Sequence, residues 1–404
     1  MLSDIFPRYH ARYSSLPVLG SHLEGFVGWL RLQGYPDLQI RRRLRAAKRL
    51  DTQFLRHGVG PQDLSAPRLL AYARDDVRLS AVVRSLVDYF AEQGILAPTP
   101  ATPTGTLVAR YRAYLEQVRG LSLLTVRAHD RSATQFLAAL RYDQVPDQLS
   151  DCDASKIESF VRTESARQSR ATLQHTVAHI RSFLRFLATS GLAPPGLDSR
   201  IDTPRLYRDE RLPRALPWDT ARALLRAIDR STCMGRRDYA MLLLIATYGL
   251  RASEVVGLRL DDVDWRSSHL RIRRPKVASS LLLPLTSEVG GALLDYIQHG
   301  RPTLPDREIF FRVRAPAGTL ERTAVTEVFQ AWARRSGLTI PFQGPHCLRH
   351  SLAVHLLRQG TPLKTIGDLL GHRSAESTCV YLRLNVEDLR DVALHLPREV
   401  EVQP

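Results

Sequence analysis

The spacing of apolar residues along this chain is almost everywhere that of an α-helix. From Ser21 onward, apolar residues recur at intervals of three and four, which places them on one face of successive helices. The spacing changes in Leu270–Arg273, where apolar and charged residues alternate, and an apolar run follows in Leu281–Leu285. Such segments are typical of strands in a small antiparallel sheet. We therefore expect a mainly α fold of the α+β class, with the small sheet in the C-terminal half.

The most apolar stretch is Asp238–Tyr248, which contains five consecutive large apolar residues, Met241 to Ile245. It is too short to span a membrane and is expected to be a core helix. No run of about 18 apolar residues occurs, and the N-terminus has no charged-then-apolar leader. The four cysteines are scattered without a CxxC pair, which favours a reducing compartment. We expect a soluble cytoplasmic protein without a membrane partner.

The chain of 404 residues is long enough for two or three domains. The segment APTPATP (97–103) is rich in proline and predicts a linker. A second linker is predicted in the polar, basic residues 196–212. We therefore predict an N-terminal helical module in residues 1–98, a four-helix domain in residues 103–195, and a C-terminal domain in residues 213–404.

The first two of these parts share short sequences. Thr-Gln-Phe-Leu occurs at 52–55 and again at 134–137, each time toward the end of a predicted second helix. The helix that contains the second copy is expected to begin at Thr125, as its N-cap. Either the parts arose by duplication, or the likeness is chance, because apolar helical stripes resemble one another.

The charge of the chain favours a polyanionic partner. It carries 57 basic and 41 acidic residues, a net charge of +16, and its pI is about 10.2. Six cations crowd one side of a predicted helix in the N-terminal module: Arg41, Arg42, Arg43, Arg45, Lys48 and Arg49. They would repel one another unless a polyanion lay nearby, so they are candidate DNA contacts. The alternative is a solvated surface.

The sequence Pro345-His346-Cys347-Leu348-Arg349-His350 predicts the start of a helix just after a proline. His346 and Arg349 are three residues apart and therefore share one face. An imidazole beside a guanidinium at a helix N-terminus suits a phosphate. Taken alone, the pair could also lie on an ordinary exposed helix face.

Two further motifs accompany this one in a fixed order. Upstream, Arg251 lies in ATYGLRASE; downstream, Leu-Gly-His ends at His372, and Tyr381 follows nine residues later. The set resembles the tyrosine recombinase (phage integrase) family, whose pattern is T-G-L-R-x-S-E, H-x-L-R-H, L-G-H and a tyrosine nine residues on. The resemblance is strong over the C-terminal half, and a weaker helical likeness extends toward the N-terminus.

The resemblance implies a role for each motif residue in breaking a phosphodiester. Tyr381 would attack the phosphorus and keep the bond energy as a phosphotyrosine ester. Arg251 and Arg349 would bind the non-bridging oxygens with permanently charged planar forks. His346 would accept the phenol proton or donate to the phosphate. His372 would donate to a non-bridging oxygen.

In the family, a lysine in a β-hairpin loop protonates the departing 5′ oxygen. Lys276 lies after the first predicted strand, and Pro284 follows eight residues later, as in the family's K-x7-P-L. The usual G-K-G-x-K-x-R loop is replaced by PKVASSL, and Leu281 stands where an arginine is common. Lys276 therefore departs from the family pattern more than the other candidates.

Cofactors are not expected. The pair Asp262 and Asp264 stands alone, which argues against a metal site, and no glycine-rich phosphate loop is present. By the resemblance, residues 103–195 would be the core-binding domain that clamps DNA. A helix predicted from Val386 to Leu396 would dock on a neighbouring protomer, or else pack within its own chain.

The resulting hypothesis is a site-specific recombinase of integrase or transposase type. It would join two double-stranded DNA segments through a 3′-phosphotyrosine and a Holliday junction, as a homo-tetramer and possibly with other recombinases. Two alternatives remain at this point. One is a type IB topoisomerase, which shares the chemistry but relaxes supercoils, and the other is a non-catalytic DNA-binding partner of another recombinase.

Overall fold

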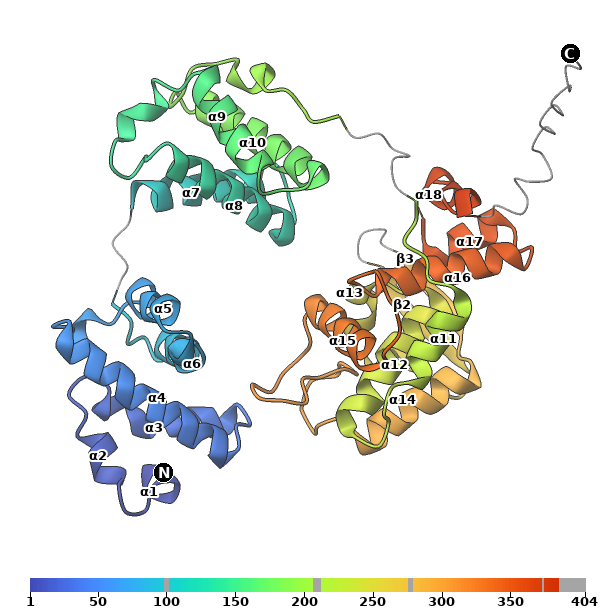
Figure 1. The fold of residues 1–404 in the computed structure, drawn as a ribbon, viewed down its shortest axis with the longest axis horizontal. Helices are drawn as coiled ribbons and strands as arrows, with labels where there is room; N and C mark the ends of the chain where they lie inside the picture. Colours follow the sequence, from blue (N-terminus) through green and yellow to red (C-terminus); the bar gives the residue numbers. More distant parts are fainter. Residues whose placement is uncertain (98–101, 206–211, 275–278, 373, 385–404) are drawn as a thin grey trace, which may run out of the picture. The chain divides into compact units, whose positions relative to one another are not determined.

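The computed structural model describes residues 1–97, 102–205, 212–274, 279–372 and 374–384 (Figure 1). Its packing divides the chain into two units. One is formed by Met1–Pro61, Tyr72–Gln93 and Arg211–Pro404, and the other by Gln62–Ala71 and Gly94–Glu210. The domain limits expected from the sequence remain a prediction, and the parts are described one at a time.

The N-terminal part is helical in the residues that the structure describes. Its elements are α1 (Leu2–Ile5), α2 (His10–Ser14), α3 (Gly20–Leu32), α4 (Asp37–Arg56), α5 (Ala66–Asp75) and α6 (Ser80–Glu92), with short 3₁₀ turns η1 (Pro61–Asp63) and η2 (Val77–Leu79). The long helix α4 buries one face completely, through Ile40, Leu44, Ala47, Leu50 and Phe54. Their spacing of three and four residues is the helical period on which the prediction rested.

The central part contains the four expected helices. They are α7 (Pro103–Ala113), α8 (Leu123–Ala139), α9 (Ala154–Ser165) and α10 (Arg170–Thr189), with a π-helical turn η3 (Tyr114–Val118) and 3₁₀ turns η4 (Pro146–Leu149) and η5 (Leu197–Arg200). The N-cap of α8 is Ser122, whose side chain accepts a hydrogen bond from the Thr125 backbone N–H. The prediction of Thr125 as the cap was therefore wrong by three residues.

The two copies of Thr-Gln-Phe-Leu occupy similar surroundings within their own parts. Phe54, near the end of α4, meets the ring of Tyr72 edge-on at 5.0 Å. Phe136, near the end of α8, meets Phe160 edge-on at 5.3 Å. The duplication remains a prediction, which this likeness supports.

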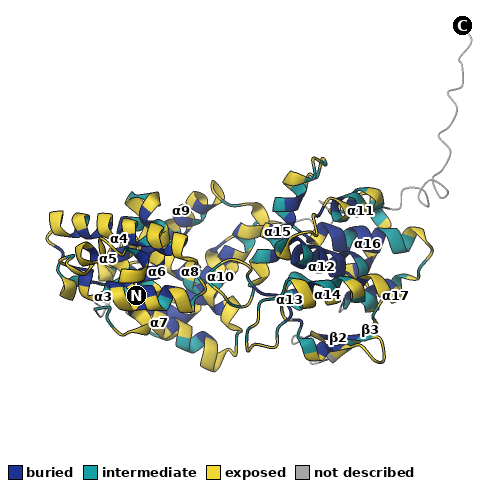
Figure 2. Cartoon of the chain, turned by 90° about the horizontal axis from the view of Figure 1, so that it is seen from below, coloured by how far each residue is buried: buried dark blue, intermediate teal, exposed yellow. Residues whose placement is uncertain are grey.

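The C-terminal part is built around α12 (Cys233–Tyr248), which is buried along most of its length (Figure 2). Around it lie α11 (Trp218–Arg226), α13 (Ala252–Val256), α14 (Ser287–His299), α15 (Arg322–Arg335) and α16 (His346–Arg358). Then follow α17 (Leu363–Leu370), α18 (Glu376–Cys379) and the turn η7 (Leu382–Leu384). The apolar stretch seen in the sequence is thus a core helix, and it begins five residues earlier, where Thr232 caps Cys233.

The small sheet has three antiparallel strands in the order β1 (Val263–Asp264), β2 (His269–Arg274), β3 (Ser279–Pro284), preceded by η6 (Leu260–Asp262). In its register Leu270 faces Leu283 and Arg274 faces Ser279. This confirms the α+β class. The strand β1 was not predicted, because two residues are too few to show an alternating pattern.

The carboxylates of Asp262 and Asp264 accept hydrogen bonds at and beside this sheet. Asp262 accepts hydrogen bonds from the Arg259 backbone and from Arg273 Nε, at 3.0 and 2.8 Å. Asp264 accepts from the backbone N–H groups of Arg266 and Ser267. Over the described residues, no three His, Cys, Asp or Glu side chains are arranged to hold a metal ion, and no helix is long and apolar enough to cross a membrane.

Candidate active site

Helix α16 presents both residues of the central motif. It begins at His346, directly after Pro345, as the sequence predicts. His346 is exposed, whereas Arg349, one turn further, is only 2% exposed. The Arg349 guanidinium donates to the carbonyl oxygens of Gly249 and Leu370. The hydrogen bonds thus join α16 to the ends of α12 and α17.

Three arginines converge on the last turn of α17. Arg274 Nη2 donates to the Leu369 carbonyl at 3.0 Å, Arg349 Nη2 to Leu370 at 2.6 Å, and Arg251 Nη2 to Gly371 at 3.2 Å. The last carbonyls of a helix have no partner within the helix and carry partial negative charge. The carbonyl oxygens at the end of α17 therefore hold three cations together, although they carry no formal charge.

Gly371 makes this arrangement possible. It ends α17 in the left-handed conformation, with φ of +64°. A Cβ atom at this position would overlap the guanidinium of Arg274. The glycine of the Leu-Gly-His motif is thus required both by the turn and by the arginine behind it.

Glu254 lies between two of the arginines. Its carboxylate accepts from the Arg251 backbone N–H and from Arg251 Nη1 at 2.8 and 2.9 Å, and lies 3.4 Å from Arg274 Nε. Burial lowers the pKa of Arg349 to about 10, and nearby Arg251 adds to this effect. With three guanidiniums and the one carboxylate of Glu254, the cluster has a formal net charge of +2.

Tyr381 is almost completely buried, at 1% exposure, in a small apolar cluster with Ala353, Val354, Ile366 and Leu370. Its hydroxyl lies 3.0 Å from Nδ1 of His350. Burial raises the pKa of the phenol, while the positive charge of Arg349 acts in the opposite direction. The phenol is therefore protonated at neutral pH, and Nδ1 of His350 accepts from it in the tautomer that carries the ring proton on Nε2.

Two further imidazoles accompany His350 in this region. The rings of His346 and His350 meet edge-on at 4.6 Å, and the ring of His372 lies 6.2 Å from that of Tyr381, with Nδ1 bonded to Thr378 Oγ1 at 2.8 Å. Desolvation, followed by the charges of neighbouring groups, lowers the pKa of His350 and of His372 to about 4, and also lowers the pKa of His346. All three are therefore neutral near pH 7.

The structure brings five of the six predicted site residues together: Arg251, His346, Arg349, His372 and Tyr381. Lys276 lies outside the described residues. The sequence analysis did not predict two further residues that lie at this site, Arg274 and His350. The alternation of β2 signals Arg274, because it falls on the same face as Leu270 and Ile272. The spacing of four residues from His346 signals His350.

Two of the six cations of α4 donate hydrogen bonds within the N-terminal part. Arg41 donates to the Ile5 carbonyl at 3.1 Å, and Arg43 donates to Ser85 Oγ at 3.2 Å while lying over the ring of Tyr35. Arg41 is nevertheless exposed. The other four cations, Arg42, Arg45, Lys48 and Arg49, are exposed as well. We call these four side chains the α4 cation face.

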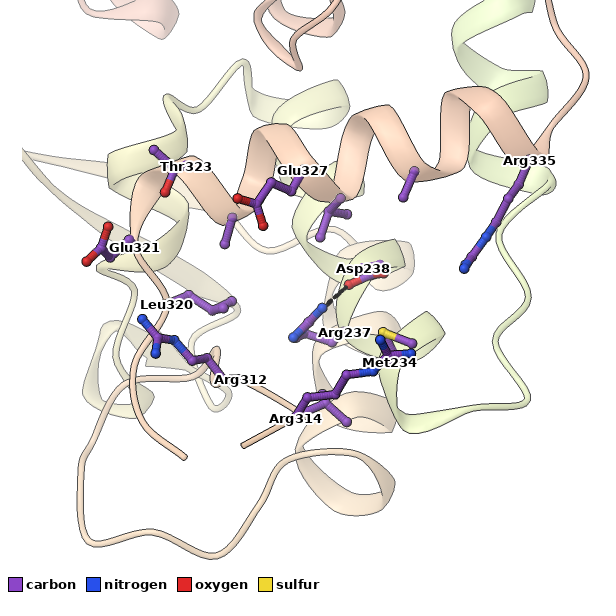
Figure 3. A pocket seen from close by; sticks show the side chains of 14 residues that line it. Met234, Arg237, Asp238, Arg312, Arg314, Leu320, Glu321, Thr323, Glu327 and Arg335 are labelled. Carbon is purple, nitrogen blue, oxygen red and sulfur yellow. Dashed lines mark hydrogen bonds and ion pairs between the residues drawn. The ribbon is translucent and has the colours of Figure 1, made fainter. Parts of the chain in front are cut away.

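A cavity between α12 and α15 is lined by none of the cluster residues (Figure 3). At its wall, Asp238 accepts from Arg237 Nε and Nη2 at 2.9 and 2.7 Å, and from Trp332 Nε1 at 2.8 Å. The remaining Arg237 nitrogen, Nη1, donates to the Phe311 carbonyl. Because the buried ion pair is fully hydrogen-bonded, it is an internal link between α12 and α15.

Comparison with known proteins agrees with the motifs. The model of the phage integrase family matches residues 214–388, and that of the phage integrase N-terminal SAM-like domain matches residues 108–191. A putative integrase/recombinase, y4rA of Sinorhizobium fredii, is 30% identical over 93% of this chain and 94% of its own length. The tyrosine recombinase XerD of Listeria innocua is 30% identical over 71% of this chain and 96% of its own.

The chain belongs to the tyrosine recombinase family. Among solved structures, XerH bound to a palindromic difH substrate has a TM-score of 0.53 and 15% identity, over 82% of this chain and 95% of that one. A lambda integrase tetramer bound to a Holliday junction has a TM-score of 0.52 and 18% identity, over 67% and 77%. At these identities the structures show the shared recombinase fold, which confirms the fold class expected from the sequence.

Proposed function

We propose that this chain is a site-specific DNA recombinase that cleaves and rejoins strands through a 3′-phosphotyrosine intermediate at Tyr381. One observation carries the proposal. The Tyr381 hydroxyl is hydrogen-bonded to a neutral imidazole beside a cluster of three guanidiniums with a net charge of +2. A phenol with a proton acceptor, next to fixed cations, is what attack on a phosphodiester requires.

The first step divides among the cluster residues. His350 takes the phenol proton as the Tyr381 oxygen attacks phosphorus, and the bond from phosphorus to the 5′ oxygen breaks. Arg251 and Arg349 bind the non-bridging oxygens, which gain charge in the pentacoordinate transition state. His346 and His372, both neutral, donate N–H hydrogen bonds to those oxygens. The product is a 3′-phosphotyrosine and a free 5′ hydroxyl.

Lys276 is proposed to protonate the departing 5′ oxygen. The register of β2 and β3 supports this, since the two strands pair up to Arg274 and Ser279 and Lys276 belongs to the short connection between them. In the reverse step, a 5′ hydroxyl of the partner duplex attacks the phosphotyrosine and Tyr381 recovers its proton. Two rounds of exchange, with a Holliday junction between them, give recombinant duplexes.

Double-stranded DNA is the partner, and we propose that four copies of the chain act on it together, as a homo-tetramer or with other recombinases. The lambda integrase tetramer on a Holliday junction supports this arrangement by analogy. The C-terminal helix predicted to join protomers lies outside the described residues. Residues 103–195 are proposed to clamp DNA as a core-binding domain, and residues 1–98 as a second DNA-binding module.

Covalent capture tests the function and finds the recombination site in the same experiment. Protein is incubated with fragmented DNA of its source organism, denatured in SDS, and any covalently attached DNA is recovered and sequenced. Wild type should retain a discrete set of sequences, and nuclease digestion should leave a nucleotide on the peptide that contains Tyr381. Tyr381→Phe should bind the same DNA and retain none.

Tyr296→Phe is the matched control, because it also removes one buried hydroxyl from the C-terminal part. It should retain covalent DNA as wild type does. An adduct from Tyr381→Phe would exclude Tyr381 as the nucleophile. Tight binding by wild type without any adduct would indicate a non-catalytic DNA-binding protein. Relaxed plasmids without joined duplexes would indicate a topoisomerase.

A further inference from the structure

Arg274 occupies a position where a sheet normally places an apolar residue. Along β2 the side chains alternate, so that Leu270, Ile272 and Arg274 are buried while Arg271 and Arg273 are exposed. The Arg274 side chain is 8% exposed. Burying a guanidinium is costly unless it is paired and hydrogen-bonded, so its surroundings should explain its presence.

Its surroundings are those of the cleavage site. Arg274 donates to the Leu369 carbonyl next to the carbonyl that holds Arg349, and its Nε faces the carboxylate of Glu254. Within the described structure, that Nε has no hydrogen bond, so its contact with Glu254 is purely ionic. Arg274 therefore touches both groups that position the two phosphate-binding arginines.

The charges of the cluster give this contact a consequence. Arg251 and Arg349 together supply two positive charges, and the nearby carboxylate of Glu254 cancels one of them. Arg274 restores the total to +2. The attacked phosphodiester carries one negative charge and approaches two in the pentacoordinate transition state, so a net +2 matches the transition state better than +1 does.

We propose that Arg274 is a positioning residue for strand cleavage. It neutralises the carboxylate of Glu254 and fixes the last turn of α17. The two positive charges of Arg251 and Arg349 are then both available to the phosphate. This inference rests on the proposed recombinase function. Arg274 itself touches Glu254 and the peptide carbonyl of Leu369, and acts on the phosphate through the other two arginines. Its side chain is needed for the charge that it carries as well as for its shape.

The first experiment compares two arginines of the same strand. Single-turnover formation of the covalent complex is measured at saturating DNA, on a duplex recovered with the wild-type protein. Arg274→Gln should slow this step roughly 10- to 100-fold, as loss of a supporting partner behind a ligand commonly does. Arg271→Gln, on the exposed face of β2, should leave the rate unchanged. DNA affinity should be nearly the same for both.

The second experiment separates charge from scaffolding. If Arg274 neutralises Glu254, then removing that carboxylate as well should help, and Arg274→Gln/Glu254→Gln should cleave about tenfold faster than Arg274→Gln alone. Arg274→Lys keeps the charge with a different shape and should retain most of the wild-type rate. A purely structural role predicts the reverse, because each further substitution would loosen the site.

The outcomes are distinct. The inference is overturned if Arg274→Gln cleaves like wild type, if Arg274→Lys is as slow as Arg274→Gln, or if the double variant is no faster than the single one. Should Arg274→Gln fail to fold, as judged by its thermal midpoint, the comparison of Arg274→Lys with wild type and with Arg274→Lys/Glu254→Gln replaces it. Failure of wild type to form the adduct would instead refute the proposed function.

Discussion

At the scale of single residues, the proposed mechanism makes the contact between Tyr381 and His350 decide where the first proton goes. A neutral imidazole can accept that proton, whereas an imidazolium cannot. Burial lowers the pKa of His350 to about 4, with the nearby His346 and Arg349 adding to this effect, so the ring is ready to accept at neutral pH. His346, the histidine that sequence reasoning favoured, lies one ring further from the hydroxyl.

We expect His350→Ala to slow formation of the covalent complex by roughly 10²–10⁴-fold, the usual contribution of a proton-transfer group. His355→Ala is the control on the same helix, where the imidazole stacks on Trp218 away from the cluster. It should lower thermal stability without slowing cleavage. If His346→Ala lost cleavage and His350→Ala kept it, the acceptor would be His346.

The same histidine predicts a dependence of stability on pH. Between pH 6.5 and about 4, an unfolded His350 binds a proton and the folded one does not. The unfolded state then binds more protons, so the free energy of unfolding falls as the pH is lowered through this window. The thermal midpoint should drop between pH 7 and pH 4.5, and by less in His350→Gln.

Lys276 can be tested by changing the leaving group. Lys276→Ala should slow cleavage by roughly 10²–10⁴-fold if the lysine supplies the proton. A 5′ sulfur in the bridging position leaves without a proton, so on that substrate the variant should approach the wild-type rate. Arg349→Ala should not recover, because its partners are the non-bridging oxygens. A persistent defect of Lys276→Ala on the sulfur substrate would assign the lysine to DNA binding.

The ordered motifs predict those residues of the candidate site that the proposed chemistry requires by type. Arg251, Arg349, His346, His372 and Tyr381 belong to motifs that follow in a fixed order, and the fold brings them together. Arg274 belongs to no motif, and its importance depends on two carbonyls and a carboxylate from distant segments. Alternation in β2 could have placed it on the buried face, but its partners could not be known before the fold.

At the scale of elements, the C-terminal turn of α17 organises the site. Gly371→Ala should lower stability, since the left-handed conformation costs alanine roughly 1 kcal/mol. Because the new Cβ also displaces Arg274, covalent complex formation should slow as in Arg274→Gln.

Gly360→Ala is a matched control for this substitution. Gly360 has φ of +80° just beyond α16, and nothing lies within 4 Å of where its Cβ would be. It should lose similar stability and keep its cleavage rate. Equal effects of the two substitutions on cleavage would mean that the closeness of Gly371 to Arg274 is unimportant.

Helices and strands could be predicted where apolar residues form a long run or a clear period. Their ends could be predicted only where a single side chain is able to cap the helix. The core helix α12 and the strand β3 were predicted from continuous apolar runs, and the strand β2 from alternation. The start of α8 could not be predicted in this way, because Ser122 and Thr125 are both good N-cap residues. Only the hydrogen bond to Ser122 shows which one is used. The strand β1 consists of two residues that pair with the edge of β2, so its own sequence carries no strand pattern.

At the scale of the whole molecule, the α4 cation face is the candidate for added DNA affinity. Replacing its four members with glutamine should lower the slope of log affinity against log salt by about 0.9 for each phosphate that the variant no longer binds. Arg84→Gln, which removes one exposed cation from α6, is the control and should leave the slope unchanged. An unaltered slope in the fourfold variant would point to a protein partner for this surface.

The burial of Tyr381 has a consequence for the genome in which such a protein works. A chromosome presents on the order of 10⁶–10⁹ non-specific positions for every intended one. If Tyr381 is the nucleophile, as proposed above, its 1% exposure and its aliphatic neighbours would keep it from attacking DNA that contacts the protein only briefly. Under the proposed function, core packing would restrain accidental nicking, and substitutions that remove aliphatic side chains around Tyr381 should raise nicking at random sites before they abolish recombination.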